Sequence, residues 1–230
     1  MQARRHVVPV QEYPLDSRDD SGKVMKRNEY ILDRAEATLR SGGLVIVPTE
    51  TFYALAGDPF NENTLRRIFG VKARPETKPL PLIAADRRTL DGVVEPPEGP
   101  TLSLIERFWP GSLTILLKPV IPVSPLLTGP DGKIAVRVPP WCAARMLAAR
   151  LGGWITATSA NLSGGPEPDD VWKIDPRVLE AVDLVLKLGP TPGGRPSTVV
   201  EPLAHGFRIV RPGAIDEAAI REVFRQGAVA

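Results

Sequence analysis

Cysteine and histidine are almost missing from this chain of 230 residues. Cys142 is the only cysteine, so an internal disulfide framework is excluded. A single thiol fits a reducing compartment, and we expect a cytoplasmic protein. The only histidines are His6 and His205, which leaves almost nothing from which to build a Ser-His-Asp triad or a multi-histidine metal centre. Two large classes of enzyme are therefore disfavoured.

Long apolar runs and the common phosphate-binding loops are also absent. No stretch approaches the roughly 18 apolar residues of a membrane-spanning helix. Residues 1–27 carry charges of both signs and no continuous apolar region, unlike a secretory signal. Neither G-x-x-x-x-G-K-S/T nor G-x-G-x-x-G occurs. A net charge of +2 is too small for bulk attraction to nucleic acid, so an anionic ligand requires a local cluster of cations.

The sequence does contain alternating helical and strand patterns, which predict an α/β protein with a sheet that is mixed rather than purely parallel. We expect a poorly ordered arm at 1–27, one domain at 28–226 and a tail at 227–230. The first predicted helix begins at Asn28, and four others cover 63–71, 101–108, 141–151 and 216–224. The predicted strands are 44–47, 80–84, 113–117, 134–138, 154–158, 184–187, 198–201 and 207–210.

Three cations gather after the second predicted helix. Lys72, Arg74 and Lys78 lie within seven residues of one another, and Pro75 restricts how the chain leaves the helix. A guanidinium offers a planar fork and an ammonium a compact charge, so together they suit a polyanion. The alternative is a solvated basic helix end that is stabilised by the helix dipole.

Hydroxyl and amide groups follow two predicted strands. Thr49, Glu50 and Thr51 follow the first strand, and strand ends in open α/β sheets face the crevice where ligands bind. Ser159 and Asn161 follow the strand at 154–158 and suit phosphate, ribose or the water shell of a cation. The alternatives are a capping turn for a following helix at Thr49 and a self-satisfied turn at Ser159.

Arg137 lies within an otherwise apolar strand. An unpaired buried guanidinium is costly, so this residue should meet either a carboxylate of the protein or an anionic ligand. Ser197 and Arg211 add a hydroxyl and another cation near the C-terminus.

In order, these segments resemble the YrdC family of threonylcarbamoyl-AMP synthases, in its short single-domain form. The similarity spans about residues 28–226. It rests on Pro-Thr-Glu-Thr, Lys-x-Arg-Pro, Phe-Trp-Pro-Gly, Ala-Val-Arg-Val-Pro, Ser-Ala-Asn-Leu-Ser-Gly, Pro-Ser-Thr-Val-Val and Arg-Pro-Gly-Ala-Ile. The resemblance implies a twisted, open, mixed sheet with flanking helices and a cationic ligand cleft. It also implies formation of L-threonylcarbamoyl-AMP from L-threonine, bicarbonate and ATP, with release of pyrophosphate, for modification of tRNA.

The resemblance further implies roles for individual residues. Threonine would contact Thr51, Arg137 and Ser197. ATP, with its Mg²⁺, would contact Arg74, Lys78, Ser159 and Arg211. Catalysis would depend on Lys72, Arg74, Ser159 and Asn161, and no metal ligand is assigned to a protein side chain. The implied partners are a downstream tRNA threonylcarbamoyl transferase and, by weak direct contact, tRNA itself.

The chain departs from the family pattern at the predicted threonine pocket. Ala54 and Ala56 replace glycines, and Ile83 replaces a histidine of longer relatives, so the pocket should differ in shape. The main alternative is an RNA-binding module of the same fold without synthase activity. A carbamoyl-phosphate-handling domain of the hydrogenase-maturation type is disfavoured, because such domains accompany zinc-finger cysteines.

Overall fold

In the computed structural model, residues 23–227 are described. The part described contains one nine-stranded sheet with the order β7-β1-β2-β6-β3-β5-β4-β8-β9. The sheet is mixed, as predicted: β1 and β7, β3 and β5, and β4 and β8 pair in parallel, and the other neighbours are antiparallel. Its strands are β1 (Val45–Pro48), β2 (Tyr53–Gly57), β3 (Leu82–Ala84), β4 (Leu113–Leu117), β5 (Ile134–Arg137), β6 (Trp154–Ser159), β7 (Leu184–Val185), β8 (Thr198–Leu203) and β9 (Gly206–Arg211).

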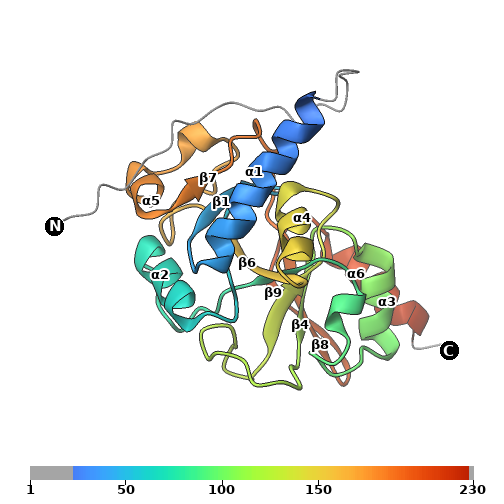
Figure 1. The fold of residues 1–230 in the computed structure, drawn as a ribbon. Coiled ribbons are helices and arrows are strands. Elements are labelled where there is room, and N and C mark those ends of the chain that lie inside the picture. The colour runs from blue at the N-terminus through green and yellow to red at the C-terminus, as the bar shows by residue number, and fades with distance from the viewer. Residues whose placement is uncertain (1–22, 228–230) are drawn as a thin grey trace.

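Helices pack on both faces of the sheet, which makes three layers (Figure 1). The α-helices are α1 (Lys23–Arg40), α2 (Glu62–Lys72), α3 (Gly99–Phe108), α4 (Ala143–Arg150), α5 (Pro176–Ala181) and α6 (Glu217–Gly227), and two 3₁₀ helices cover Arg88–Leu90 and Val171–Lys173. Side chains of a strand alternate between faces. Val45 therefore joins the core beneath α1 and α4, and Ile46 joins the core beneath α2, α3, α5 and α6.

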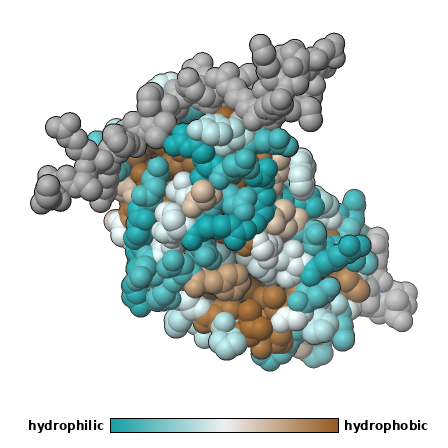
Figure 2. Space-filling model, viewed as in Figure 1, coloured by the Kyte–Doolittle hydropathy of each residue, from teal (hydrophilic) through white to brown (hydrophobic). Residues whose placement is uncertain are grey.

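Helix α1 is amphipathic. Leu32, Ala35 and Leu39 recur at helical spacing and are buried against the sheet. The opposite side of the helix is hydrophilic in the space-filling view (Figure 2). No helix within residues 23–227 is long and apolar enough to cross a membrane.

Strand register gathers the segments that matter for the site. Ser159, at the end of β6, lies opposite Ala54 near the start of β2. Arg137, at the end of β5, lies opposite Ile83 of β3. Arg211, the last residue of β9, lies opposite Val199 of β8.

The structure corrects several predicted elements. Helix α1 begins at Lys23 instead of Asn28, so residues 23–27 of the predicted arm are helical; residues 1–22 and 228–230 lie outside the described residues. Strand β2 was not predicted, because its side chains are buried on both faces and show no polar alternation. Helix α5 was also missed, since it has only six residues. The segment 186–187 is not part of β7, which ends at Val185.

Candidate functional site

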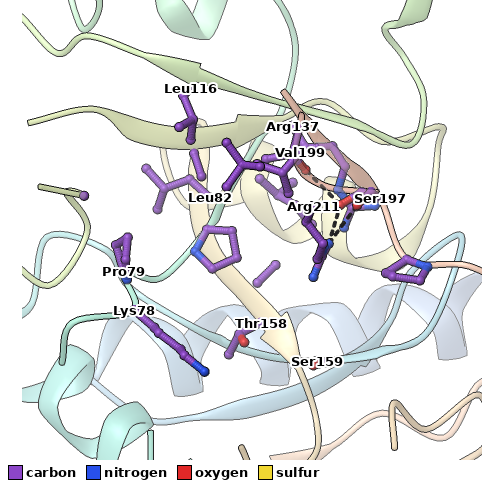
Figure 3. Close-up of a pocket in the computed structure, with 18 of the residues that line it drawn as sticks. Lys78, Pro79, Leu82, Leu116, Arg137, Thr158, Ser159, Ser197, Val199 and Arg211 are labelled. Atoms are coloured by element: carbon purple, nitrogen blue, oxygen red, sulfur yellow. Dashed lines mark hydrogen bonds between the residues drawn. The ribbon is translucent and has the colours of Figure 1, made fainter. Parts of the chain in front are cut away.

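One cavity of about 640 Å³ brings together residues from seven strands, namely β2, β3, β4, β5, β6, β8 and β9, and from the turns and loops that join them, including the segment after α2. Figure 3 shows Arg137, Ser197 and Arg211 on one side of it and Lys78 and Ser159 on the other. Seven of the nine residues assigned to the site line this cavity, namely Thr51, Arg74, Lys78, Arg137, Ser159, Ser197 and Arg211. Lys72 and Asn161 do not line it.

A hydrogen-bonded group lies where β4, β8 and β9 meet. Arg211 donates from Nη2 to the Ser197 carbonyl (2.8 Å) and to its Oγ (3.1 Å). The Ser197 hydroxyl is also 2.8 Å from Oγ1 of Thr114. Gly213 permits this approach, since a Cβ there would lie 2.3 Å from the Pro196 carbonyl oxygen. The Arg-Pro-Gly motif therefore holds a guanidinium beside the Ser197 hydroxyl.

Arg137 is buried and forms an ion pair with Glu50, so the predicted structural carboxylate partner exists. Arg137 also lines the cavity, so the two predicted environments of this residue do not exclude each other. Burial lowers the pKa of Arg137 to about 10, and the group stays cationic at neutral pH. Oε2 of Glu50 is buried without a hydrogen-bond partner.

The segment after β1 is a tight turn into β2, and the predicted capping turn for a helix is wrong. Thr49 holds this turn: its hydroxyl donates to the Phe52 carbonyl (2.8 Å) and accepts from the Thr51 amide (3.2 Å). The Thr51 carbonyl accepts from the Gly193 amide at 2.8 Å, so the turn is tied to the loop at 188–197. These bonds fix Thr51 against the cavity.

The cations after α2 point in different directions. Ala73 ends the helix with φ 46° and ψ 43°, a left-handed conformation that is unfavourable for a residue with a Cβ. Beyond this reversal Arg74 reaches the cavity, where its Nε donates to the Lys78 carbonyl (2.8 Å) and its Nη2 to the Pro79 carbonyl (3.0 Å). Burial, followed by the charge of Arg211, lowers the pKa of Arg74.

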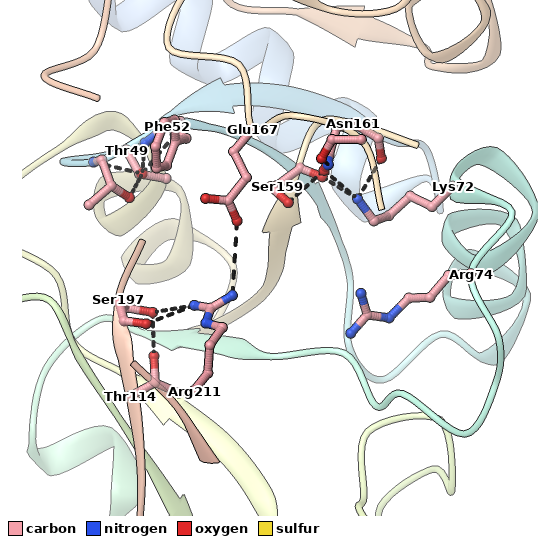
Figure 4. Close-up of polar contacts among 12 residues, drawn as sticks. Thr49, Phe52, Lys72, Arg74, Thr114, Ser159, Asn161, Glu167, Ser197 and Arg211 are labelled. Atoms are coloured by element: carbon pink, nitrogen blue, oxygen red, sulfur yellow. Dashed lines mark hydrogen bonds and ion pairs between the residues drawn. The ribbon is translucent and has the colours of Figure 1, made fainter. Parts of the chain in front are cut away.

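Lys72 lies beneath the Ser159–Asn161 loop instead of on the cavity wall (Figure 4). Its side chain is buried, so the alternative of a solvated helix end is wrong for this residue. Burial, and then the charge of Arg74, lowers the pKa of Lys72 to about 7. Its ammonium donates to the Ser159 carbonyl, the Asn161 carbonyl and the Asn161 side-chain oxygen.

The loop itself is a self-satisfied turn that still presents one hydroxyl to the cavity. The Ser159 hydroxyl donates to Oδ1 of Asn161 (2.6 Å), and Nδ2 of Asn161 donates to the Gly165 carbonyl (2.5 Å). The alternative predicted from the sequence, a self-satisfied turn at Ser159, therefore describes the loop correctly. Ser159 nevertheless lines the cavity, so the turn and the site coincide.

Three further residues belong to the site and were not assigned from the sequence: Glu50, Thr114 and Glu167. Glu167 lines the cavity and lies 3.9 Å from Arg211. Thr114 looks like any core strand residue, and Glu167 lies in a proline-rich loop without a periodic pattern. Only the Pro-Thr-Glu-Thr motif carries a signal, because it places Glu50 at a strand end beside the assigned Thr51.

Within residues 23–227, no three His, Cys, Asp or Glu side chains form a metal-binding group. A magnesium ion that arrives with a nucleotide needs only one or two carboxylates besides phosphate oxygens and water. Glu167 and the Ser159 hydroxyl supply oxygen ligands of this kind on the cavity wall. The residues present therefore fit a nucleotide-borne ion better than a resident metal centre.

The fold and the cavity define a class: an α/β protein with a mixed sheet and a cavity lined in part by cationic side chains. The sequence profile of the Sua5/YciO/YrdC family, described as "Telomere recombination", matches residues 37–213. The chain belongs to this family.

Two relatives and one solved structure illustrate the similarity. The chain is 34% identical to the threonylcarbamoyl-AMP synthase of Bacillus subtilis, over 86% of this chain and 58% of the relative. It is 36% identical to that of Stenotrophomonas maltophilia, over 69% of this chain and 86% of the relative. The structure of P. abyssi Sua5 complexed with L-threonine superposes with a TM-score of 0.77 at 32% identity, over 85% of this chain and 57% of that one. The chain thus spans less than three fifths of two of these proteins.

Proposed function

We propose that this chain is a threonylcarbamoyl-AMP synthase, which makes L-threonylcarbamoyl-AMP and pyrophosphate from L-threonine, bicarbonate and ATP. The observation that carries the proposal is the pairing, in one cavity, of the Arg137, Thr51 and Ser197 group with the Arg74, Lys78, Ser159 and Arg211 group. The names of the relatives support the same activity.

The buried Arg137 suits the carboxylate of threonine, since a guanidinium in a dry site binds a carboxylate with two parallel hydrogen bonds. Glu50 forms an ion pair with the same guanidinium, so Arg137 is not left as an unpaired buried cation when no ligand is bound. Thr51 and Ser197 offer hydroxyls beside it. Ala54 and Ile83 also line the cavity, whereas Ala56 does not, so two of the three departures from the family pattern lie where they would shape the amino-acid pocket.

The chemistry requires positioning and charge stabilisation instead of a protein nucleophile. The amino group of threonine attacks bicarbonate to form a carbamate with loss of water. A carbamate oxygen then bonds to the α-phosphorus, and the bond from that phosphorus to the bridging oxygen breaks to release pyrophosphate. Arg74, Lys78 and Arg211 are placed to stabilise the charge that develops on the phosphates.

Magnesium bound to ATP would neutralise part of the triphosphate charge, and Glu167 and Ser159 would be its contacts on the protein. Within the cell we infer a cytoplasmic location, a downstream tRNA threonylcarbamoyl transferase that consumes the product, and a weak contact with tRNA.

The test is pyrophosphate release by the purified chain with ATP, Mg²⁺, bicarbonate and L-threonine. We expect release that stops when threonine is omitted and that falls at least 100-fold in Arg74→Met. Arg66→Met is the matched control, because Arg66 lies on the outside of α2 and pairs with Glu62. Threonine-independent release would refute the proposal. Absent turnover together with tight RNA binding would favour the RNA-binding alternative.

A further inference from the structure

Lys72 is the one assigned cation that the cavity does not reach. Its exposed fraction is 1%, whereas Arg74 and Lys78 both line the cavity wall. The left-handed backbone at Ala73 separates the two directions: the residue before it points beneath the Ser159–Asn161 loop and the residue after it points toward the cavity (Figure 4).

The hydrogen bonds of Lys72 leave no donor for a ligand. An ammonium has three N–H donors. The loop supplies three acceptors: the Ser159 carbonyl, the Asn161 carbonyl at 2.7 Å and Oδ1 of Asn161 at 3.1 Å. Arg74 differs, because two of its five donors meet backbone carbonyls and the others are available to an anion.

These bonds hold the part of the loop that does line the cavity. Oδ1 of Asn161 accepts from Lys72 and also from the Ser159 hydroxyl at 2.6 Å. The ammonium therefore fixes the amide that orients this hydroxyl. In the opposite direction, the Ser163 amide donates to the Lys72 carbonyl at 2.8 Å, so the end of α2 and the end of β6 are joined by both backbone and side chain.

We propose that Lys72 is a positioning residue, which acts on the nucleotide through Ser159 and Asn161 instead of touching the triphosphate. The proposal rests on the proposed synthase function only for the identity of the ligand. In this arrangement Lys72 is buried behind the residues that line the cavity, and Arg74 is itself one of the lining residues. The Lys-x-Arg motif then combines two tasks that the sequence does not separate.

The first experiment is hydrogen exchange of the amides of residues 160–163 in Lys72→Met and in the wild-type chain. We expect faster exchange at these amides in the variant, because three oxygens of the loop lose their donor. Arg74→Met is the matched control and should leave this exchange unchanged. Unaltered exchange in a folded Lys72→Met protein would overturn the positioning role. This measurement needs no activity, so its failure is distinct from a failure of the synthase proposal.

The second experiment is a mutant cycle scored by ATP affinity in calorimetry. Alone, Lys72→Met should weaken ATP binding by up to about 100-fold, the loss expected when a hydrogen bond to a charged group is no longer formed well. In a Ser159→Ala, Asn161→Ala background the same change should cost less than threefold, since nothing is left to position. Arg74→Met should lose the same factor in both backgrounds. A Lys72 effect that persists undiminished would mean direct contact with the nucleotide.

A third measurement uses the wild-type chain and covers the case in which Lys72→Met does not fold. With lysine labelled by ¹³C at Cε, we expect ATP to shift the signal of Lys78 on the cavity wall and to leave that of Lys72 nearly in place. A shift of Lys72 as large as that of Lys78 would refute the proposal.

Discussion

Glu50→Ala should destabilise the protein strongly, because it leaves the guanidinium of Arg137 buried without its carboxylate. The two side chains are 12% and 10% exposed, so water can replace little of the lost charge. Breaking a buried ion pair by removing one partner typically costs about 3–5 kcal/mol. For a chain of this length that loss corresponds to a fall in melting temperature on the order of 10 °C.

Urea denaturation of Glu50→Ala, Arg137→Met and the double variant measures this cost. The double variant should be at least about 1 kcal/mol more stable than the sum of the two single losses predicts, since it removes both charges together. Ser112→Ala is the matched control: it removes the 3.3 Å hydrogen bond to Glu50 but keeps the carboxylate, and should cost less than about 1.5 kcal/mol.

Threonine adds a second readout to the same variant. If its carboxylate binds Arg137, it supplies the missing anion, so a saturating concentration should raise the melting temperature of Glu50→Ala more than that of the wild type. A Glu50→Ala protein within about 1 kcal/mol of the wild type would refute the reasoning about the buried pair. An equal threonine shift in both proteins would refute the placement of the carboxylate.

Three further predictions concern backbone geometry and pH. Ala73→Gly should stabilise the chain by about 1 kcal/mol, because glycine adopts the φ of 46° without strain. This gain should raise the melting temperature by about 2–4 °C. An unchanged melting temperature would mean that Ala73 is unstrained. Gly213→Ala should destabilise by about 1–3 kcal/mol in urea and weaken ATP binding, since its Cβ would lie 2.4 Å from the Thr198 amide nitrogen; wild-type values would contradict this. The folded-state pKa of Lys72, about 7, is below the unfolded value of 10.5, so the unfolded chain binds more protons between these values. The free energy of unfolding should therefore rise with pH from 7 to 10.5, by at most about 1.4 kcal/mol per pH unit. This rise should vanish in Lys72→Met. An identical pH profile of stability in both proteins would refute the prediction.

Most of the sheet could be predicted from local patterns, and the exceptions have physical reasons. Strands β4 and β6 are short apolar segments between turn signals, and their predicted and observed bounds agree within a residue. Strand β2 has no such signal, because both of its faces are buried and alanine, which occurs twice in it, is also common in helices. Its existence depends on pairing with β1 and β6, which local periodicity does not reveal.

The candidate site was predicted better as a set of residues than as a geometry. The ordered motifs named seven residues that share one cavity. They did not show that Glu50 is the partner of Arg137 or that Thr114 and Glu167 face the same space. Such pairs are decided by strand order and register, which join residues far apart in the chain.

Lys72 and Arg74 show the division most clearly. The sequence by itself determined that two cations stand two residues apart at the end of an amphipathic helix, followed by a proline that prevents the helix from continuing. Only the tertiary structure decided that one of them is buried against Asn161, 89 residues further along the chain, while the other faces the cavity. The reason is physical: local composition sets where a helix ends, but the burial of a charge depends on which oxygens the folded sheet brings to it.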